Sequence, residues 1–503
     1  MYSNTTMIGF VILLLIVLLV AYLPLKRKHS YWTRRGVLQI EPNFLFGNFR
    51  DVALGKNINP KVIMAAYKAF KKAGVQHGGI YMTYCPLWIP VDLKLIKQIM
   101  NNDSSYFAGH GYFYKHKDDI LSNNLFSAEG RYWKELRSKL TPTFTCGKLK
   151  LMFEILKIIG DKLEKKMDNL YLHKEPLNVK EVAACFSTDV IASCLFGVES
   201  NTLNEPSNDF RKYGKKVFET GFFWELLQMF VNWNMLNFFG YSWLSKDVNK
   251  FFIKLVKDII QYREQNSIIR NDFLHLLLEL RKIENIKRSS SFTLNDITAN
   301  VFLMYVAGFE TTSSTISFLM YELAIHQDIQ EKVRKEILKV LAEVPDGHLT
   351  YDHLQKMNYC DKVIQETLRR HSVASHIPRL CTTDYKIPDS NVIIQKGTNV
   401  LIPSWSIHND TEFFPNPEQF DPENFSEESK AARPKLTFLA FGKGPRQCFG
   451  MRFAYLELKL TLVKYLKNYK YSLNEKTPKE IEYHANPITI EPKGKILLDI
   501  SQI

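Results

Sequence analysis

Apolar residues recur at helical spacing through the middle of the chain. Residues 148–172 place Leu, Ile and Met three and four positions apart, with Lys and Glu between them, which is the pattern of an amphipathic helix. Residues 248–280 follow the same pattern. A further segment, from about Leu294 to His326, is apolar nearly all round, as a buried helix is. The spacing therefore predicts a mainly helical fold.

Strand-like segments are short and few. Near residues 78–90, 385–402 and 487–500, β-prone runs are punctuated by Pro and Gly, which is typical of small sheets. The polar stretch 281–292 is predicted to be a surface loop, and 403–445 combines prolines and aromatic residues with little periodicity. We therefore predict mainly α structure with small β-sheets, in one compact domain.

The first residues predict a membrane anchor. From Met7 to Leu23 the chain is apolar and uncharged, near the lower limit of length for a spanning helix. Basic residues at 26–28 follow at once, and positive charge keeps its side of a membrane cytosolic. A cleaved signal peptide would carry that charge before the apolar run. We expect a single-pass anchor over 1–25 and one folded domain over 26–503.

Composition and charge exclude several classes. The 503 residues are 46% hydrophobic and 23% charged, which suits a globular protein with a sizeable core. The net charge is +14, but Lys and Arg are dispersed, so we expect no nucleic acid partner. A basic balance also suits an anionic membrane or an acidic protein. Seven cysteines without a C-x-x-C pair argue against a disulfide framework or a zinc site and favour a reducing compartment.

The stretch FGKGPRQCFG, residues 441–450, crowds three glycines and an arginine around Cys448. The thiolate is the metal-binding form of cysteine. The glycines allow the backbone to turn so that N–H groups point at the sulfur, and Arg446 can reach an anion on the same side. A strongly helical segment follows, and a helix N-terminus favours an anion. The loop therefore predicts one anionic sulfur facing a metal.

Two other interpretations of this loop stay open. A lone cysteine is often a small buried hydrophobic residue. Gly442 and Gly444 also resemble half of a dinucleotide-binding fingerprint, but Gln447 stands where the third glycine is required.

An acid and an alcohol stand side by side in the long apolar helix. Glu310 and Thr311 follow Ala307 and Gly308, whose small size lets another body approach the backbone. The Thr311 hydroxyl can bond the carbonyl of Ala307 and loosen the helix locally. Such a turn could hold water and relay protons. A polar patch on a solvent-facing side of the helix is the alternative.

Two weaker pairs lie elsewhere. Glu366 and Arg369 are three residues apart and can pair on one helix face, although isolated pairs of this kind are usually solvated. Trp133 and Arg137 share a helix face at spacing four, which ordinary amphipathic packing would also explain.

Together these motifs resemble those of the cytochrome P450 family. The pattern F-x-x-G-x-R-x-C-x-G is matched in full at 441–450, A-G-x-E-T at 307–311, E-x-x-R at 366–369 and W-x-x-x-R at 133–137. Their order and spacing fit the family over nearly the whole chain. Stretches such as FFPNPEQFDPENF, residues 413–425, resemble the insect microsomal branch, whose members oxidise xenobiotics and other lipophiles.

The resemblance implies haem b as the cofactor. Cys448 would be the axial thiolate on the haem iron, and Phe441 would pack near the sulfur. The haem propionates would be held by Trp133, Arg137, Arg379 and Arg446. Glu310 and Thr311 would deliver protons to iron-bound dioxygen.

The resemblance also implies a reaction and partners. One oxygen atom would enter a lipophilic small molecule and the other would become water, with haem carrying the chemistry. Electrons would come from an NADPH-dependent flavoprotein reductase, sometimes with cytochrome b5. The enzyme would sit on the cytosolic face of the endoplasmic reticulum membrane. By position, the substrate contacts would include Tyr112, Phe113, Phe222, Phe223, Trp224 and Trp233.

One departure concerns the family's P-E-R-F motif. This chain reads Pro422-Glu423-Asn424-Phe425, so the arginine that would join Glu366 and Arg369 is absent. The resemblance implies that Glu366 and Arg369 form a structural clamp, which ties their helix to the aperiodic segment. Without the arginine, a weaker or rearranged clamp is expected.

Two functions compete with a monooxygenase. A thiolate-haem isomerase or dehydratase needs no reductase, but such enzymes can do without the acid–alcohol pair that this chain keeps. A haem-binding sensor or carrier would show no turnover. Coupled consumption of NADPH would separate these classes.

Overall fold

The structure is a computed structural model that covers most of the chain. It describes residues 26–111, 119–218, 244–287, 292–344, 348–485 and 489–503. The predicted anchor, residues 1–25, lies outside these ranges. So do the aromatic residues predicted as substrate contacts, which are Tyr112, Phe113, Phe222, Phe223, Trp224 and Trp233. Within the described ranges, no helix is long and apolar enough to cross a membrane.

The described residues fold into two compact units. The first takes its described residues from Met1–Gly111 and His376–Ser406, and the second from Tyr112–Thr220, Asn237–Ser375 and Ile407–Ile503. Each unit therefore combines segments that are far apart in the sequence. The single domain expected over 26–503 stays a prediction.

The first unit is built on a four-stranded sheet. Its strands run in the order β1 (His77–Met82), β2 (Cys85–Pro90), β7 (Asn399–Ile402) and β4 (Ile377–Leu380). β2 and β7 are parallel, and the other neighbours are antiparallel. The other elements are η1 (Thr33–Arg35), α2 (Arg50–Ala53), α3 (Asn59–Lys72), α4 (Leu93–Lys97), η2 (Gln98–Asn102), β5 (Tyr385–Lys386) and β6 (Ile393–Ile394).

Two glycines in β1 make room for large rings. A Cβ on Gly78 would overlap the ring of Phe70 in α3, and a Cβ on Gly79 would overlap the indole of Trp32. Both rings are almost completely buried, and the Trp32 indole N–H donates to the carbonyl of Ile80 at 3.2 Å. Glycine in a strand often marks such a close approach.

The second unit is mainly helical. Its helices are α5 (Gly130–Leu140), η3 (Thr141–Phe144), α6 (Cys146–Leu172), α7 (Val179–Ile191), η4 (Ala192–Phe196), α8 (Asp209–Phe218), α11 (Lys246–Asn266), α12 (Phe273–Lys287), α13 (Leu294–Ile325), α14 (Gln327–Ala342), α15 (Tyr351–Gln355), α16 (Asn358–Arg370), η6 (Pro422–Phe425), α18 (Glu427–Ala432) and α19 (Met451–Leu466). A further short helix, α17 (Ser404–His408), contains the point in the sequence where the first unit ends and the second unit resumes.

Two small sheets complete the second unit. One has the order β3 (Leu177–Asn178), β11 (Leu497–Gln502) and β8 (Tyr469–Leu473), and the other pairs β9 (Tyr483–Ala485) with β10 (Ile490–Pro492). All of these pairings are antiparallel. The prediction of a mainly helical fold with small sheets is confirmed.

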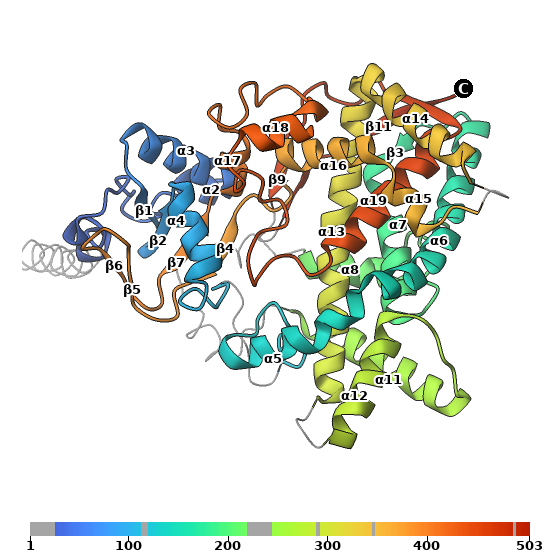
Figure 1. The fold of residues 1–503 in the computed structure, drawn as a ribbon, viewed down its shortest axis with the longest axis horizontal. Helices are drawn as coiled ribbons and strands as arrows, with labels where there is room; N and C mark the ends of the chain where they lie inside the picture. The colour runs from blue at the N-terminus through green and yellow to red at the C-terminus, as the bar shows by residue number, and fades with distance from the viewer. Residues whose placement is uncertain (1–25, 112–118, 219–243, 288–291, 345–347, 486–488) are drawn as a thin grey trace, which may run out of the picture. The chain divides into compact units, whose positions relative to one another are not determined.

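The long helix α13 is the centre of the second unit (Figure 1). A capping box between Thr293 and Asp296 fixes its start, because each side chain bonds the other's backbone N–H. The helix packs against α7, α16, α19 and β10, among others. The predicted span from Leu294 to His326 is therefore confirmed, with His326 as the C-terminal cap.

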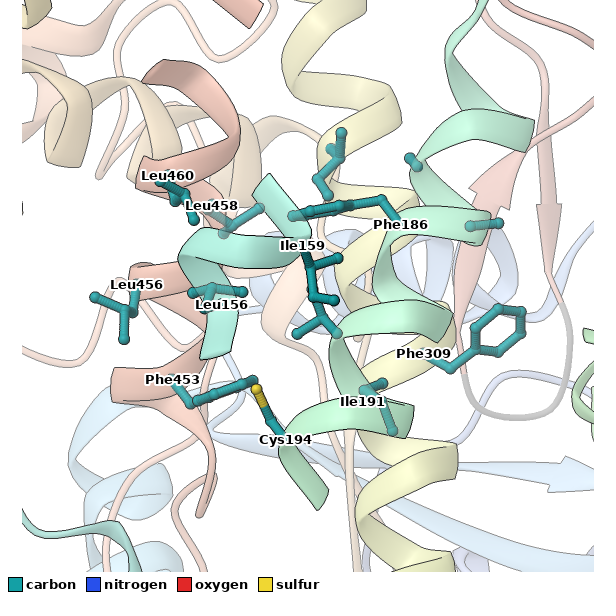
Figure 2. Close-up of a cluster of buried hydrophobic side chains, with 14 of the residues drawn as sticks. Leu156, Ile159, Phe186, Ile191, Cys194, Phe309, Phe453, Leu456, Leu458 and Leu460 are labelled. Atoms are coloured by element: carbon teal, nitrogen blue, oxygen red, sulfur yellow. The ribbon is translucent and has the colours of Figure 1, made fainter. Parts of the chain in front are cut away.

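The core beside α13 joins four helices. Figure 2 shows Leu156 and Ile159 of α6, Phe186 and Ile191 of α7, and Phe309 of α13 in one apolar cluster. It also shows side chains from α19, namely Phe453, Leu456, Leu458 and Leu460. Because α19 packs against α6 and α13, this core fixes the helix that follows the cysteine loop.

Two predictions on the middle of the chain need correction. The segment 248–280 is two helices, α11 and α12, because Ser267 takes a left-handed conformation with φ of +53° and ends α11. The surface loop predicted for 281–292 is wrong at its start, because α12 continues to Lys287. Its Arg, Lys and Glu residues are good helix formers, so polarity alone was a poor sign of a loop.

Candidate active site

The loop before Cys448 is a tight turn closed by its own backbone. Gly442 and Gly444 have φ of +67° and +75°, the left-handed region that glycine adopts without strain. The backbone N–H of Cys448 donates to the carbonyl of Phe441 at 2.8 Å. Gly450 differs, because its φ is −88° and a Cβ there would meet no atom within 4 Å. The turn therefore requires two glycines. The conformation of Gly450 does not need a glycine, although its N–H points at the sulfur, as predicted.

The sulfur of Cys448 lies at the start of α19, as predicted. Burial raises the pKa of the Cys448 thiol, while N–H groups of Gly450 and Met451 and the charge of Arg137 act in the opposite direction. The residue as a whole nevertheless stays accessible to solvent. Burial outweighs the two N–H bonds and the charge of Arg137, and a metal cation would complete the stabilisation of the thiolate.

Helix α5 is joined to this loop by its two predicted residues. The guanidinium of Arg446 lies 4.1 Å from the ring centroid of Trp133, a cation–π contact. The guanidinium of Arg137 donates to the carbonyl of Gln447 at 3.1 Å. The structure thus brings Trp133, Arg137, Arg446 and Cys448 together, and simple amphipathic packing does not account for the pair on α5.

One face of α13 is uncovered where the acid and alcohol stand. Ala307 is exposed and Glu310 and Thr311 are partly exposed, although most of the helix around them is buried. The Thr311 hydroxyl donates to the carbonyl of Ala307 at 2.6 Å, as predicted. The helix stays continuous through this turn, so the predicted loosening does not break it.

Gly308 lets another body approach the backbone, as predicted. A Cβ on Gly308 would lie 2.9 Å from Cδ1 of Ile191 in α7. The body that approaches the backbone there is therefore a neighbouring helix. Ala307 is the small residue left open on the other side of the turn.

These residues fit a haem group. The loop offers the sulfur of a solvent-exposed Cys448 with N–H donors, which suits a metal-bound thiolate. Arg137 and Arg446 place two guanidinium groups by the same loop, and guanidinium groups bind carboxylates well. The uncovered turn of α13 belongs to a helix that packs against α19, which begins directly after the loop.

Arg379 belongs to the first unit. It lies in β4, and its guanidinium donates to the carbonyl of Pro378 at 2.8 Å. Burial lowers the pKa of Arg379 to about 10. Its role with the haem propionates stays a prediction.

The pair Glu366–Arg369 is completely buried. Arg369 donates to both carboxylate oxygens of Glu366, at 2.7 and 2.8 Å. It also donates to backbone carbonyls of the aperiodic segment, at His408, Pro417 and Gln419. The alternative of a solvated surface pair is wrong, and the pair ties α16 to that segment, as the family resemblance implies.

Asn424 joins this clamp in place of the missing arginine. Its side-chain amide donates to Glu366 at 3.2 Å. Sequence reasoning missed Arg433, whose guanidinium lies 4.5 Å from the ring of Phe414 and 4.9 Å from that of Phe425. The charge of Glu366 acts on Arg433 and partly offsets the lowering of its pKa by burial. The sequence did offer a signal for this contact, because an arginine, Arg433, follows soon after the altered motif.

The comparisons with known proteins agree with this fold. The cytochrome P450 family model matches residues 39–498, and the chain belongs to the cytochrome P450 family. It is therefore a cytochrome P450 monooxygenase, an enzyme class that works with haem iron.

The relatives are insect proteins. The chain is 39% identical to cytochrome P450 6a2 of Drosophila melanogaster, over 96% of this chain and 97% of that protein. It is 38% identical to the probable cytochrome P450 6a14 of the same species, over 94% and 96%. Cytochrome P450 6A1 of Musca domestica is 35% identical, over 94% of each chain. The resemblance to the insect branch is confirmed.

Proposed function

We propose that this chain binds haem b through Cys448 and oxidises lipophilic small molecules with electrons from an NADPH-dependent flavoprotein reductase. The observation that carries the proposal is the cysteine loop, in which the sulfur of a solvent-exposed Cys448 has two backbone N–H donors and the nearby charge of Arg137. Haem bound there supplies the activation of dioxygen, by which one oxygen atom enters the substrate and the other becomes water.

The cationic residues of the site hold and orient the cofactor. Arg137 and Arg446 bind its carboxylates by charge-assisted hydrogen bonds, and Trp133 keeps Arg446 in place by the contact at 4.1 Å. Arg379 adds a further cation to this set. The carbonyl of Phe441 fixes the backbone of Cys448, so the sulfur keeps one direction.

Glu310 and Thr311 handle protons. Burial raises the pKa of Glu310 to about 7, so this carboxyl holds and releases a proton near neutral pH. The Thr311 hydroxyl is oriented by the carbonyl of Ala307, and its oxygen stays available to accept a hydrogen bond on the uncovered face. Glu310 supplies the proton and Thr311 positions the group that receives it.

The sequence supports a place at the endoplasmic reticulum membrane. Residues 1–25 serve as a single-pass anchor, and 26–503 form the monooxygenase domain on the cytosolic side. The net charge of +14 suits an acidic surface on the reductase and on cytochrome b5, because opposite charge steers encounter. Lys134 on α5 is exposed and is one contact for such a partner.

An optical titration of the purified ferric protein tests the proposal. Lipophiles that enter the site should displace water from the metal and move the haem band toward the high-spin form. The matched control is Cys448→Ala, which should lose the thiolate signature while the fold persists. Folded protein that takes up no haem when supplied with it would refute the role of Cys448.

A second assay addresses turnover. With added reductase, NADPH oxidation should rise with a lipophilic substrate and yield an oxygenated product in proportion. Intact haem with no product from a broad panel of lipophiles would contradict the proposed substrate class.

A further inference from the structure

A second carboxyl group lies against Glu310. It belongs to Glu491 in β10, and the two side chains are within hydrogen-bonding reach of each other. Carboxyl groups so close share a proton, because two negative charges there repel. The hydroxyl of Ser314 also donates to Glu310, at 3.2 Å. The acid of α13 is thus one member of a pair contributed by two elements that pack together.

Glu491 connects this pair to the protein surface. The imidazole Nδ1 of His484 in β9 lies 2.9 Å from one oxygen of Glu491, and Nζ of Lys180 in α7 lies 2.8 Å from the other. The side chain of His484 is 59% exposed, whereas that of Glu491 is 19% exposed. A continuous chain of titratable groups therefore runs from solvent to the uncovered turn of α13.

The electrostatics order the protons along this chain. Burial and the charge of Glu491 raise the pKa of Glu310 to about 7. Burial acts to raise the pKa of Glu491 as well, but bonds from His484 and Lys180 outweigh it and lower the pKa to about 2. The shared proton therefore rests on Glu310, and Glu491 is an anion that accepts a proton and passes it inward.

Other titratable or charged groups near Glu310 do not supply its proton. Tyr305, one turn earlier on α13, donates to the carbonyl of Phe210 at 2.8 Å, and burial raises its pKa far above neutrality. Arg211 on α8 is held by Glu181 at 3.0 Å. Lys180 also donates to the carbonyl of Pro492 at 2.9 Å, so it positions the strand that carries Glu491.

We propose that His484 and Glu491 are the proton-entry route that recharges Glu310 in each catalytic cycle. This inference rests on the proposed role of Glu310 and Thr311. A proton passes from water to the His484 imidazole, then to the Glu491 carboxylate, then to the Glu310 carboxylate that has given up its own proton. Each transfer breaks one N–H or O–H bond and forms another, and no electrons change place.

The first test is an infrared titration of the holoenzyme, which follows the carbonyl band of protonated carboxyl groups. The wild type should show a band that disappears near pH 7. In Glu491→Gln the like charge is gone, so the midpoint should fall to lower pH. Glu482→Gln is the matched control. Glu482 is an exposed carboxylate that pairs with Lys493 at 2.8 Å, and it is not one of the groups in the proposed proton route. It should leave the midpoint unchanged.

The second test measures delivery of protons. With reductase present, Glu491→Gln should lower the yield of product per NADPH about tenfold and increase the solvent deuterium isotope effect, with haem content unchanged. His484→Ala should show a smaller loss that added imidazole restores. If Glu491→Gln failed to retain haem, the His484 variant, changed at an exposed site, would decide alone.

The outcomes separate the two proposals. Glu491 and His484 variants that match the wild type, beside a Glu310→Gln variant that loses product, would overturn the route and keep the role of Glu310. A Glu310→Gln variant that matches the wild type would refute the role of Glu310 itself, and the route with it.

Discussion

Two acids of the second unit, the fully buried Glu366 and the partly exposed Glu310, lie in opposite surroundings. Glu366 accepts two bonds from a guanidinium and others from a backbone N–H and a side-chain amide. Glu310 has one hydroxyl donor and faces the carboxyl of Glu491. Burial acts to raise the pKa of both acids, but only Glu366 has a cation bonded to it.

The difference separates structure from chemistry. A buried charge that is fully paired holds segments together and is costly to disturb. A partly desolvated acid without a bonded cation keeps a proton that it can give away near neutral pH. In the sequence, Glu366 and Glu310 both appear as acids of helical motifs. The groups that contact each carboxyl in the fold determine whether its role is structural or chemical. The predictions that follow test this contrast.

The largest expected effect comes from removing the cation of the clamp. Arg369→Ala leaves Glu366 buried without a charge partner, and breaking such a pair costs about 3–5 kcal/mol. Denaturant unfolding should show that loss, together with a lower haem content. The control is Arg131→Ala, because Arg131 pairs with Glu135 on the surface, where its side chain is 92% exposed. Surface pairs contribute about 0–1 kcal/mol. An Arg369 variant as stable as this control would refute a structural role for the clamp.

The second prediction concerns catalysis at Glu310. Glu310→Gln keeps the size of the side chain but removes the proton donor, so turnover should fall roughly 10²-fold, the lower range for a general acid. Haem content and the optical response to substrate should stay at wild-type values, because the residue does not hold the cofactor. Loss of haem in this variant would place Glu310 with the structural acids instead.

The third prediction is that a substitution at Glu310 stabilises the protein at high pH, whereas the substitution at Arg369 destabilises it. The folded pKa of about 7 for Glu310 exceeds the usual value near 4.3 in an unfolded chain. The folded state therefore binds more protons between these values, and stability falls as pH rises through that window. Glu310→Gln lacks this loss, so at pH 8 it should gain about 1–3 kcal/mol over the wild type, relative to their difference at pH 4.5. Unfolding curves at the two pH values measure the gain.

An unchanged difference between the two pH values would show that Glu310 is ionised in the folded state. In that case its surroundings would resemble those of Glu366, and the contrast between the two acids would disappear.

The long helix and the turn of the cysteine loop could be predicted from local sequence patterns. The span of α13 follows from its apolar residues and its Thr293 cap, which are close in sequence. The turn before Cys448 follows from Gly442 and Gly444, whose left-handed backbone is a local property. Features of this kind depend on residues that are close together in the sequence, so they can be predicted from it.

Contacts between distant segments were harder to predict. Nothing near Glu310 in the sequence points to Glu491, which lies 181 positions later and reaches α13 through the β9–β10 sheet. The small size of Gly308 predicted that another body approaches the backbone, but it did not name Ile191 of a different helix as that body. The loop predicted from 281 onward failed because charged residues suit a solvent-facing helix as well as a loop. These outcomes depend on packing partners that spacing does not name.

The smallest predicted effect tests how the clamp adapts to Asn424. Arg433 contacts the rings of Phe414 and Phe425 with its planar guanidinium and donates to the carbonyl of Asn424 at 2.5 Å. Arg433→Lys keeps the charge but loses the planar group, which lysine does not replace at stacked sites. We expect a loss of about 1 kcal/mol in unfolding free energy.

The control for Arg433 is Lys430→Ala, on the exposed helix α18 just before it. Lys430 pairs with Glu427, whose side chain is 93% exposed, so its loss should stay within about 0.5 kcal/mol. If Arg433→Lys were equally mild, the charge near Glu366 would be what matters and the stacking would not. The clamp would then tolerate the missing arginine because any nearby cation offsets the buried acid, whereas Glu310, which has no cation bonded to it, keeps its proton.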